Sequence, residues 1–119
     1  MEMQLPKIGQ GIGLYKWDDT HVSILREGIG LGLTMIDTAE AYNHGQTEEM
    51  LSKVIKDTRD KVIISSKFSP EHSRFNEVIK SAEGSLARLK TDYIDIYYQH
   101  WPSHNVEIEE TVQSMSKLK

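Results

Sequence analysis

The chain has 119 residues with a formal net charge of −4 at pH 7, an apolar content of 38%, and no cysteine. This length permits one domain with a core, yet it is well short of the roughly 250 residues of a complete eight-unit (β/α) barrel. The acidic balance and the scattered Lys and Arg residues predict neither nucleic acid nor an anionic membrane as a partner, and the lack of cysteine excludes disulfides and thiolate chemistry.

Apolar strand-like runs alternate with amphipathic helical patterns, which predicts βα units around a parallel sheet. A first strand is expected near residues 12–15. A helix then begins at Asp19 or Thr20 and ends before Gly30. The later elements are a strand ending at Asp37, a helix over residues 47–56, a strand ending at Lys67, a helix over residues 75–89, a strand ending at His100, and a helical pattern over residues 108–118. This order predicts an α/β fold with about four βα units, a half barrel of TIM type, in one domain over residues 1–119.

A half barrel would have two unpaired strand edges and an inner face without a covering layer. The apolar side chains expected on that face are Met35, Ile63, Ile94 and Ile96. We therefore expect self-association through this face, with two half barrels closing on each other. The alternative is a rearranged open sheet of the doubly wound kind.

An ionisable side chain stands where each of three successive apolar strands ends, namely Asp37, Lys67 and His100. Tyr42 follows Asp37 by five residues. The carboxyl ends of the strands of a parallel barrel gather at one rim, so these four side chains are expected to converge there. Each one alone could equally be the first solvated residue of a loop. Their recurrence on consecutive strands favours an acid–base cluster.

Such a cluster suits proton transfer to a carbonyl oxygen that is being reduced. A phenol titrates at about 10, and an adjacent ammonium lowers that pKa toward neutrality. Lys67 would act in this way on Tyr42, and Asp37 would keep the ammonium charged. His100 would help to orient and polarise the carbonyl. The hydride has to come from a cofactor.

Two segments resemble signatures of the aldo-keto reductase family. They are residues 35–49, with the sequence MIDTAEAYNHGQTEE, and residues 92–102, with the sequence DYIDIYYQHWP. The resemblance extends over essentially the whole chain and implies a metal-free (β/α)8 barrel enzyme that reduces aldehydes and ketones with NADPH. It also implies a catalytic tetrad, which falls on Asp37, Tyr42, Lys67 and His100, with Tyr42 as the general acid.

The same resemblance implies further site residues, and it also implies that part of the cofactor site is missing from this chain. The nicotinamide end of the cofactor would contact Gly13, Leu14, Tyr15 and Asp37, and the substrate pocket would be walled by Trp17 and Trp101. Members of the family are about twice this length or more, and most of their cofactor contacts lie in the second half. We therefore expect this chain alone to bind NADPH weakly or not at all and to be inactive. The alternative interpretation is a non-catalytic half-barrel remnant that acts as a self-association or protein-interaction module.

The remaining candidates have simpler interpretations. Trp17 and Trp101 could be half-buried core residues. Residues 11–13 lack the rest of a dinucleotide-binding fingerprint and predict a tight turn. Glu48 and Glu49 are expected in the first turn of a helix, where the helix dipole favours acids. No metal site is expected, because ligand spacing is lacking among His21, His44, His72 and His104.

The cellular location is predicted from the apolar pattern alone. The longest apolar stretches are far below about 18 residues, and the first residues lack a basic flank followed by an apolar segment. We therefore expect a cytoplasmic protein.

Overall fold

Four parallel strands form one sheet in the order β1–β2–β3–β4, so each strand pairs with its neighbour in sequence. The structure is a computed structural model that describes residues 2–13 and 15–119. Its strands are β1 Gln10–Gly11, β2 Met35–Asp37, β3 Ile63–Phe68 and β4 Ile96–Gln99. Its helices are α1 Val22–Gly30, α2 Gln46–Ile55, α3 Phe75–Leu89 and α4 Ile108–Lys117, with short 3-10 turns η1 Asp19–His21, η2 Tyr42–Gly45, η3 Arg59–Lys61 and η4 Pro70–His72. The predicted half barrel of βα units is confirmed, and the alternative of a rearranged open sheet is wrong.

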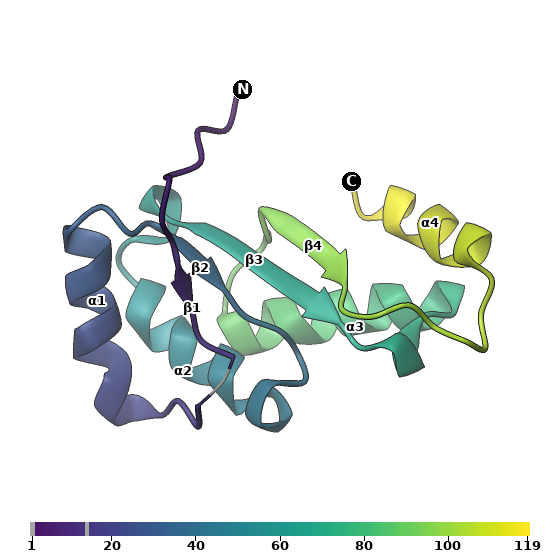
Figure 1. The fold of residues 1–119 in the computed structure, drawn as a ribbon, viewed down its shortest axis with the longest axis horizontal. Helices are drawn as coiled ribbons and strands as arrows, with labels where there is room; N and C mark the ends of the chain where they lie inside the picture. Colours follow the sequence, from purple (N-terminus) through teal and green to yellow (C-terminus); the bar gives the residue numbers. More distant parts are fainter. Residues whose placement is uncertain (1, 14) are drawn as a thin grey trace.

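Helices α1, α2 and α3 pack against one another in chain order and cover one face of the sheet (Figure 1). The strand residues that face these helices are fully buried, as Ile36, Ile64 and Phe68 show. On the opposite face Ile63 is half-buried, and Tyr98 is 51% exposed. The period-two alternation of each strand thus separates a buried helix-facing side from a more open side, as the wall of a parallel barrel requires.

The first strand lies earlier than predicted. The apolar pattern predicted a strand near residues 12–15, whereas β1 is Gln10–Gly11, with Gln10 opposite Ile36. The side-chain amide of Gln10 decides this register, because its Nε2 donates hydrogen bonds to the carbonyl oxygens of Leu25 (3.2 Å) and Leu33 (3.1 Å). The buried Ile12 follows and extends the pairing by one bond, from its N–H to the carbonyl of Asp37 (3.2 Å). A polar residue therefore fixes the strand, and the apolar pattern does not reveal it.

The other element boundaries are close to the predicted ones. β2 ends at Asp37 as predicted, β3 extends one residue past Lys67, and β4 ends one residue before His100. The first helical turn is capped by Asp18, one residue earlier than predicted, and its side chain accepts a hydrogen bond from the Thr20 N–H (2.9 Å).

Arg59 ties the amino-terminal ends of β3 and β4 together, at the edge of the sheet opposite to the predicted site. Its guanidinium donates to the Asp95 carboxylate (2.8 Å) and lies 3.7 Å from the centre of the Tyr93 ring. Asp95 also accepts the N–H of Ile64 (2.8 Å). These contacts stabilise the crossover between the two strands and leave the carboxyl ends free for other side chains.

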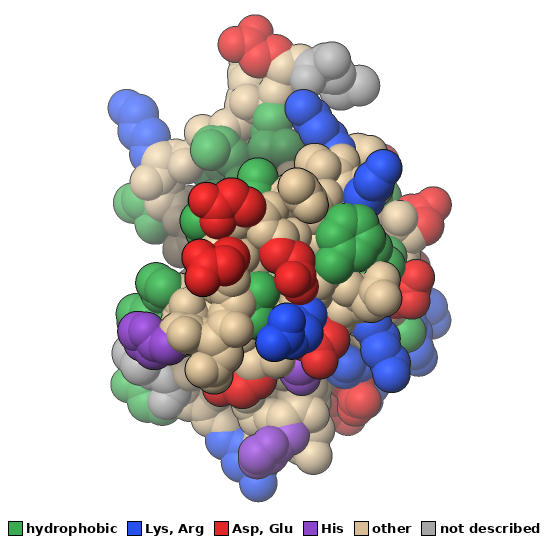
Figure 2. All heavy atoms as spheres, turned by 90° about the vertical axis from the view of Figure 1, so that its right-hand side faces the viewer, with side chains coloured by type: hydrophobic (Ala, Val, Ile, Leu, Met, Phe, Trp, Pro, Cys, Tyr) green, Lys and Arg blue, Asp and Glu red, His purple; other side chains and the backbone are tan. Residues whose placement is uncertain are grey.

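Helix α4 packs against α3. Its Glu110 accepts a hydrogen bond from the Phe75 N–H (2.8 Å), which caps the first turn of α3. Figure 2 views the molecule from the side where α4 lies and shows acidic and basic side chains interspersed on that face. Within residues 2–13 and 15–119, no helix has both the length and the apolar character needed to cross a bilayer.

Candidate active site

The carboxyl ends of β2, β3 and β4 bring together the three ionisable residues predicted to mark them. Asp37 is the last residue of β2, and Lys67 lies near the end of β3. His100 follows β4 directly, and its N–H donates to the carbonyl of Phe68 (2.9 Å). Parallel pairing in register thus places three residues that are far apart in sequence at one edge of the sheet.

Lys67 and Asp37 form the closest ion pair of this cluster. The Lys67 ammonium donates to both carboxylate oxygens of Asp37 (2.8 and 2.7 Å) and to the carbonyl of Thr38 (2.8 Å). The Lys67 side chain is only 15% exposed, while that of Asp37 is 40% exposed. The buried ammonium thus has an acceptor oxygen on each of three sides, which offsets the cost of taking its N–H donors out of water.

Tyr42 lies between Lys67 and His100. The Lys67 ammonium is 5.4 Å from the centre of the Tyr42 ring. The Tyr42 and His100 rings meet edge to face, with centres 5.5 Å apart and planes at 79°. The four residues predicted from the sequence are therefore neighbours in the structure.

The turn that carries Tyr42 has an uncommon backbone. Asn43 and His44 have positive φ angles of 49° and 54°, and Gly45 follows with a φ of 87°. Two consecutive left-handed residues that are not glycine are costly, and such conformations persist where surrounding contacts impose them. One such contact joins the side chains of Asn43 and Gln46 (3.1 Å). The turn η2 thus redirects the chain sharply between Tyr42 and helix α2.

The environment of His100 favours its neutral form. Partial burial lowers the pKa of His100 below its ordinary value of 6.5, and the Lys67 ammonium lowers it further, while Asp37 and Glu40 act in the opposite direction. A neutral imidazole at pH 7 can donate one N–H without adding a positive charge beside Lys67. By contrast, burial raises the pKa of Tyr97 far above its ordinary value, and Glu40 and Glu48 raise it further. Tyr97 therefore stays a neutral phenol.

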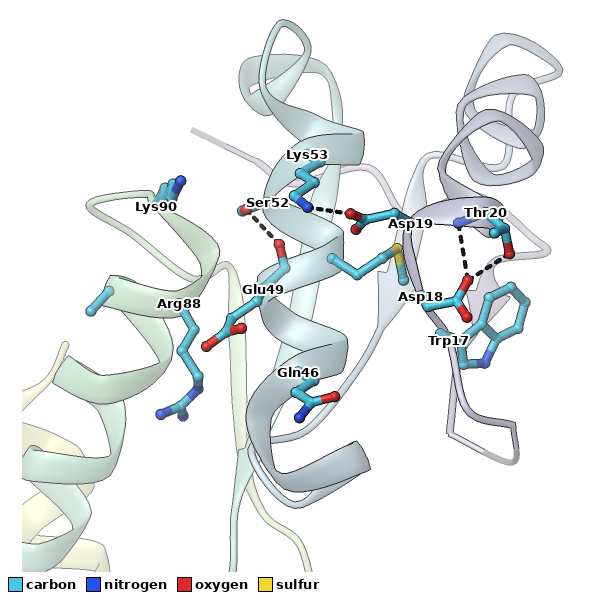
Figure 3. A pocket seen from close by; sticks show the side chains of 12 residues that line it. Trp17, Asp18, Asp19, Thr20, Gln46, Glu49, Ser52, Lys53, Arg88 and Lys90 are labelled. Atoms are coloured by element: carbon cyan, nitrogen blue, oxygen red, sulfur yellow. Dashed lines mark hydrogen bonds and ion pairs between the residues drawn. The ribbon is translucent and has the colours of Figure 1, made fainter.

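The two tryptophans lie in different places. Trp101 stacks on the His100 ring, with centres 5.7 Å apart and planes at 6°, and is 66% exposed. Trp17 packs against the core and meets the rings of Tyr15 (6.5 Å) and His21 (4.9 Å) edge to face. It lines a hollow of about 690 Å³ between η1, α2 and α3, on the helical side (Figure 3). Trp17 is half-buried against the core, and its place beside a substrate stays a prediction.

The residues predicted to contact the cofactor have different surroundings in the structure. Gly13 lies against Tyr42, since a Cβ atom at Gly13 would come within 2.8 Å of the tyrosine Cζ. Tyr15 is 74% exposed. The carboxylate of Asp37 is engaged by Lys67. Leu14 lies outside the described residues.

Two glutamates near the cluster have roles that the sequence did not indicate. Glu48 lies in the first turn of α2, as predicted, but it is also fully buried and accepts hydrogen bonds from Ser66 (2.9 Å) and Arg88 (2.9 Å). Glu40 lies between Asp37 and Tyr42 in sequence and accepts the Ser69 N–H (2.8 Å). Their partners are 18 to 40 residues away along the chain, so no local pattern could have identified them.

Comparison with known proteins gives consistent matches. A sequence model of the Aldo/keto reductase family matches residues 7–119. Methylglyoxal reductase YeaE of Escherichia coli is 43% identical over 122 residues, which cover 98% of this chain and 42% of that protein. Aldo-keto reductase YhdN of Bacillus subtilis is 38% identical over 133 residues, which cover 98% of this chain and 40% of that protein.

A solved structure of an aldo-keto reductase from Klebsiella pneumoniae, in complex with NADPH, superposes with a TM-score of 0.90 at 40% identity. The superposition covers 96% of this chain and 41% of that one. The chain thus spans about two fifths of the length of the relatives it matches.

Proposed function

This chain belongs to the aldo/keto reductase family, and from that premise we propose that its residues serve the reduction of an aldehyde or ketone to an alcohol with NADPH. The observation that carries the proposal is the contact of Tyr42 with both the Lys67 ammonium, 5.4 Å from the ring centre, and the His100 ring, whose centre lies 5.5 Å away in an edge-to-face arrangement. A phenol flanked by a cation and a neutral imidazole is a suitable proton donor to an oxygen that gains negative charge.

Each residue of the tetrad has a separate part in this proposal. Tyr42 donates its proton to the carbonyl oxygen as that oxygen becomes an alkoxide. Lys67 stabilises the negative charge left on the phenol oxygen, and Asp37 compensates the Lys67 charge through two short hydrogen bonds. The neutral His100 holds the carbonyl by an N–H donor, and Trp101, stacked on it, borders the substrate.

The donor set fits a nicotinamide cofactor, whose part in the reaction would be to supply the hydride. Gly13 lies directly against the Tyr42 ring, where a Cβ atom would come within 2.8 Å of the tyrosine Cζ, so the lack of a side chain at Gly13 lets the phenol keep this position beside the first strand. This chain offers few further candidates for holding the cofactor, namely Tyr15 and Asp37 among the described residues. We therefore propose that the 119-residue chain alone binds NADPH weakly or not at all and does not turn over.

The test has two arms. Titration of the chain with NADPH, followed by cofactor fluorescence, measures whether it binds by itself. In the second arm, residues 7–119 replace the matching segment of Escherichia coli methylglyoxal reductase YeaE, and reduction of methylglyoxal with NADPH is measured for this chimera and for its Tyr42→Phe variant. We expect turnover by the folded chimera and its loss in the variant. Equal rates for the two would refute Tyr42 as the general acid.

A non-catalytic role as a self-association module is the second candidate. The observation that favours it is the open side of the sheet, where Tyr98 is 51% exposed and Ile63 is half-buried. Two copies that met through this side would cover these side chains and the adjoining strand edges. Light scattering across a range of concentrations checks this proposal, and a stable monomer at all concentrations would count against it.

A further inference from the structure

Glu40 joins the segment that carries Tyr42 to the segment that follows Lys67. Its carboxylate accepts the Ser69 N–H (2.8 Å), and the same oxygen lies 2.5 Å from Nδ1 of His72. Its own N–H donates to the carbonyl of Lys67 (3.1 Å). The Glu40 side chain is only 9% exposed, so these contacts are poorly replaced by water.

Tyr42 needs such support because the backbone that follows it is strained. Asn43 and His44 both have positive φ angles, of 49° and 54°. On the far side of the turn, Gly45 passes under the Arg88 side chain, since a Cβ atom there would come within 2.8 Å of the Arg88 Cδ. The turn thus lies against Arg88 at one end, and Glu40 ties the segment before it to Ser69 at the other.

We propose that Glu40 is a positioning residue that sets Tyr42 relative to Lys67 and His100 through its hydrogen bond to Ser69. Glu40 does not face the rim itself, because it lines a separate hollow of about 690 Å³ together with His72 and Arg88. Its relevance to catalysis rests on the proposed function, since it acts through Tyr42. A displacement of about 1 Å of a catalytic group is enough to cost about a hundredfold in rate.

Glu40 also acts on His100 through its charge, and this effect can be tested separately from its hydrogen bond to Ser69. The carboxylate raises the pKa of His100, against the lowering by burial and by Lys67, and Asp37 acts in the same direction as Glu40. Removing the charge while keeping an acceptor should therefore lower the His100 pKa without moving Tyr42. Removing the Ser69 N–H donor while keeping the Glu40 charge should displace Tyr42 and leave the His100 pKa unchanged.

Three variants of the chain use this separation. Glu40→Gln keeps an oxygen acceptor and removes the charge, whereas Glu40→Ala removes both. Ser69→Pro removes only the donor, because Ser69 has a φ of −73°, which suits proline. Glu71→Ala, at an exposed acid in η4, is the matched control.

Nuclear magnetic resonance of the chain supplies three readouts: hydrogen exchange of the Ser69 amide, the cross-relaxation peak between the Tyr42 and His100 rings, and the His100 pKa. In Glu40→Ala we expect Ser69 protection to fall by about tenfold or more, a weaker ring–ring peak, and a lower His100 pKa. In Glu40→Gln we expect the peak to persist and the His100 pKa to fall. In Ser69→Pro we expect a weaker cross-relaxation peak between the Tyr42 and His100 rings and an unchanged His100 pKa.

An unchanged ring–ring peak in both Glu40→Ala and Ser69→Pro would overturn the proposal, because Tyr42 would then keep its place without the tie. If Glu40→Ala does not fold, Ser69→Pro decides alone. None of these readouts requires turnover, so an inactive chimera would remove the proposed function and leave this test intact.

Discussion

The ring of Tyr42 lies against the backbone of Gly13, so closely that a methyl group at Gly13 would come within 2.8 Å of the tyrosine Cζ and 3.0 Å of its hydroxyl oxygen. Gly13 follows β1, and Tyr42 follows β2, so the contact joins the first two strand ends of the sheet. Gly13 therefore determines how near the phenol can come to the wall of the site.

Substitution of Gly13 should displace the phenol. We expect Gly13→Ala to push the Tyr42 ring away, to weaken its cross-relaxation peak with His100, and to reduce turnover of the YeaE chimera by about a hundredfold for a shift near 1 Å. Gly11→Ala is the matched control, because a Cβ atom there meets nothing within 4 Å. Loss of the peak in both variants would point to a general effect on β1 instead.

The Asp37–Lys67 pair should contribute to stability as well as to the site. Asp37→Asn removes the charge opposite an ammonium whose side chain is 15% exposed, and we expect a loss of about 1–2 kcal/mol in the free energy of unfolding. Lys67→Met and the double variant complete a cycle measured by urea denaturation. A coupling energy near zero would contradict a functional ion pair between these residues.

Glu48 should be more important for folding than its position in a first helical turn suggests. Glu48→Ala leaves Arg88 and the buried Ser66 without their acceptor, and we expect it to cost about 2–3 kcal/mol of unfolding free energy. The neighbouring Glu49→Ala, at an exposed side chain in the same turn, should change stability by about 0.5 kcal/mol or less. Urea denaturation of the two variants makes the comparison, and equal effects would be evidence against the buried pair.

His100 should make stability depend on pH in one direction. Its pKa is lowered on folding, so the unfolded chain binds the proton more readily. The contribution of His100 is complete above its ordinary pKa of 6.5 and is lost as the pH falls through that value toward the lower folded one. Unfolding measured between about pH 8 and pH 5 should show a steeper decline for the natural chain than for His100→Gln. A shallower decline for the natural chain than for His100→Gln would mean that folding raises the His100 pKa.

The sequence by itself determined the architecture and the identity of the rim residues. Nearly continuous apolar runs, separated by amphipathic helical patterns, predict parallel βα units because helices cover the sheet and bury its strands. Asp37, Lys67 and His100 were recognisable since each ends such a run. Parallel strands in register then have to bring these ends to the same edge.

Only the tertiary structure decided the features that depend on contacts between residues far apart in the sequence. Gln10 fixes the first strand through carbonyls of Leu25 and Leu33, so a polar residue overrides the apolar pattern. Glu48 is buried because Ser66 and Arg88 reach it from β3 and α3. Trp17 packs against the core on the helical side of the sheet. These outcomes depend on side-chain complementarity between elements, which is a property of the packed chain and has no periodic signature in the sequence.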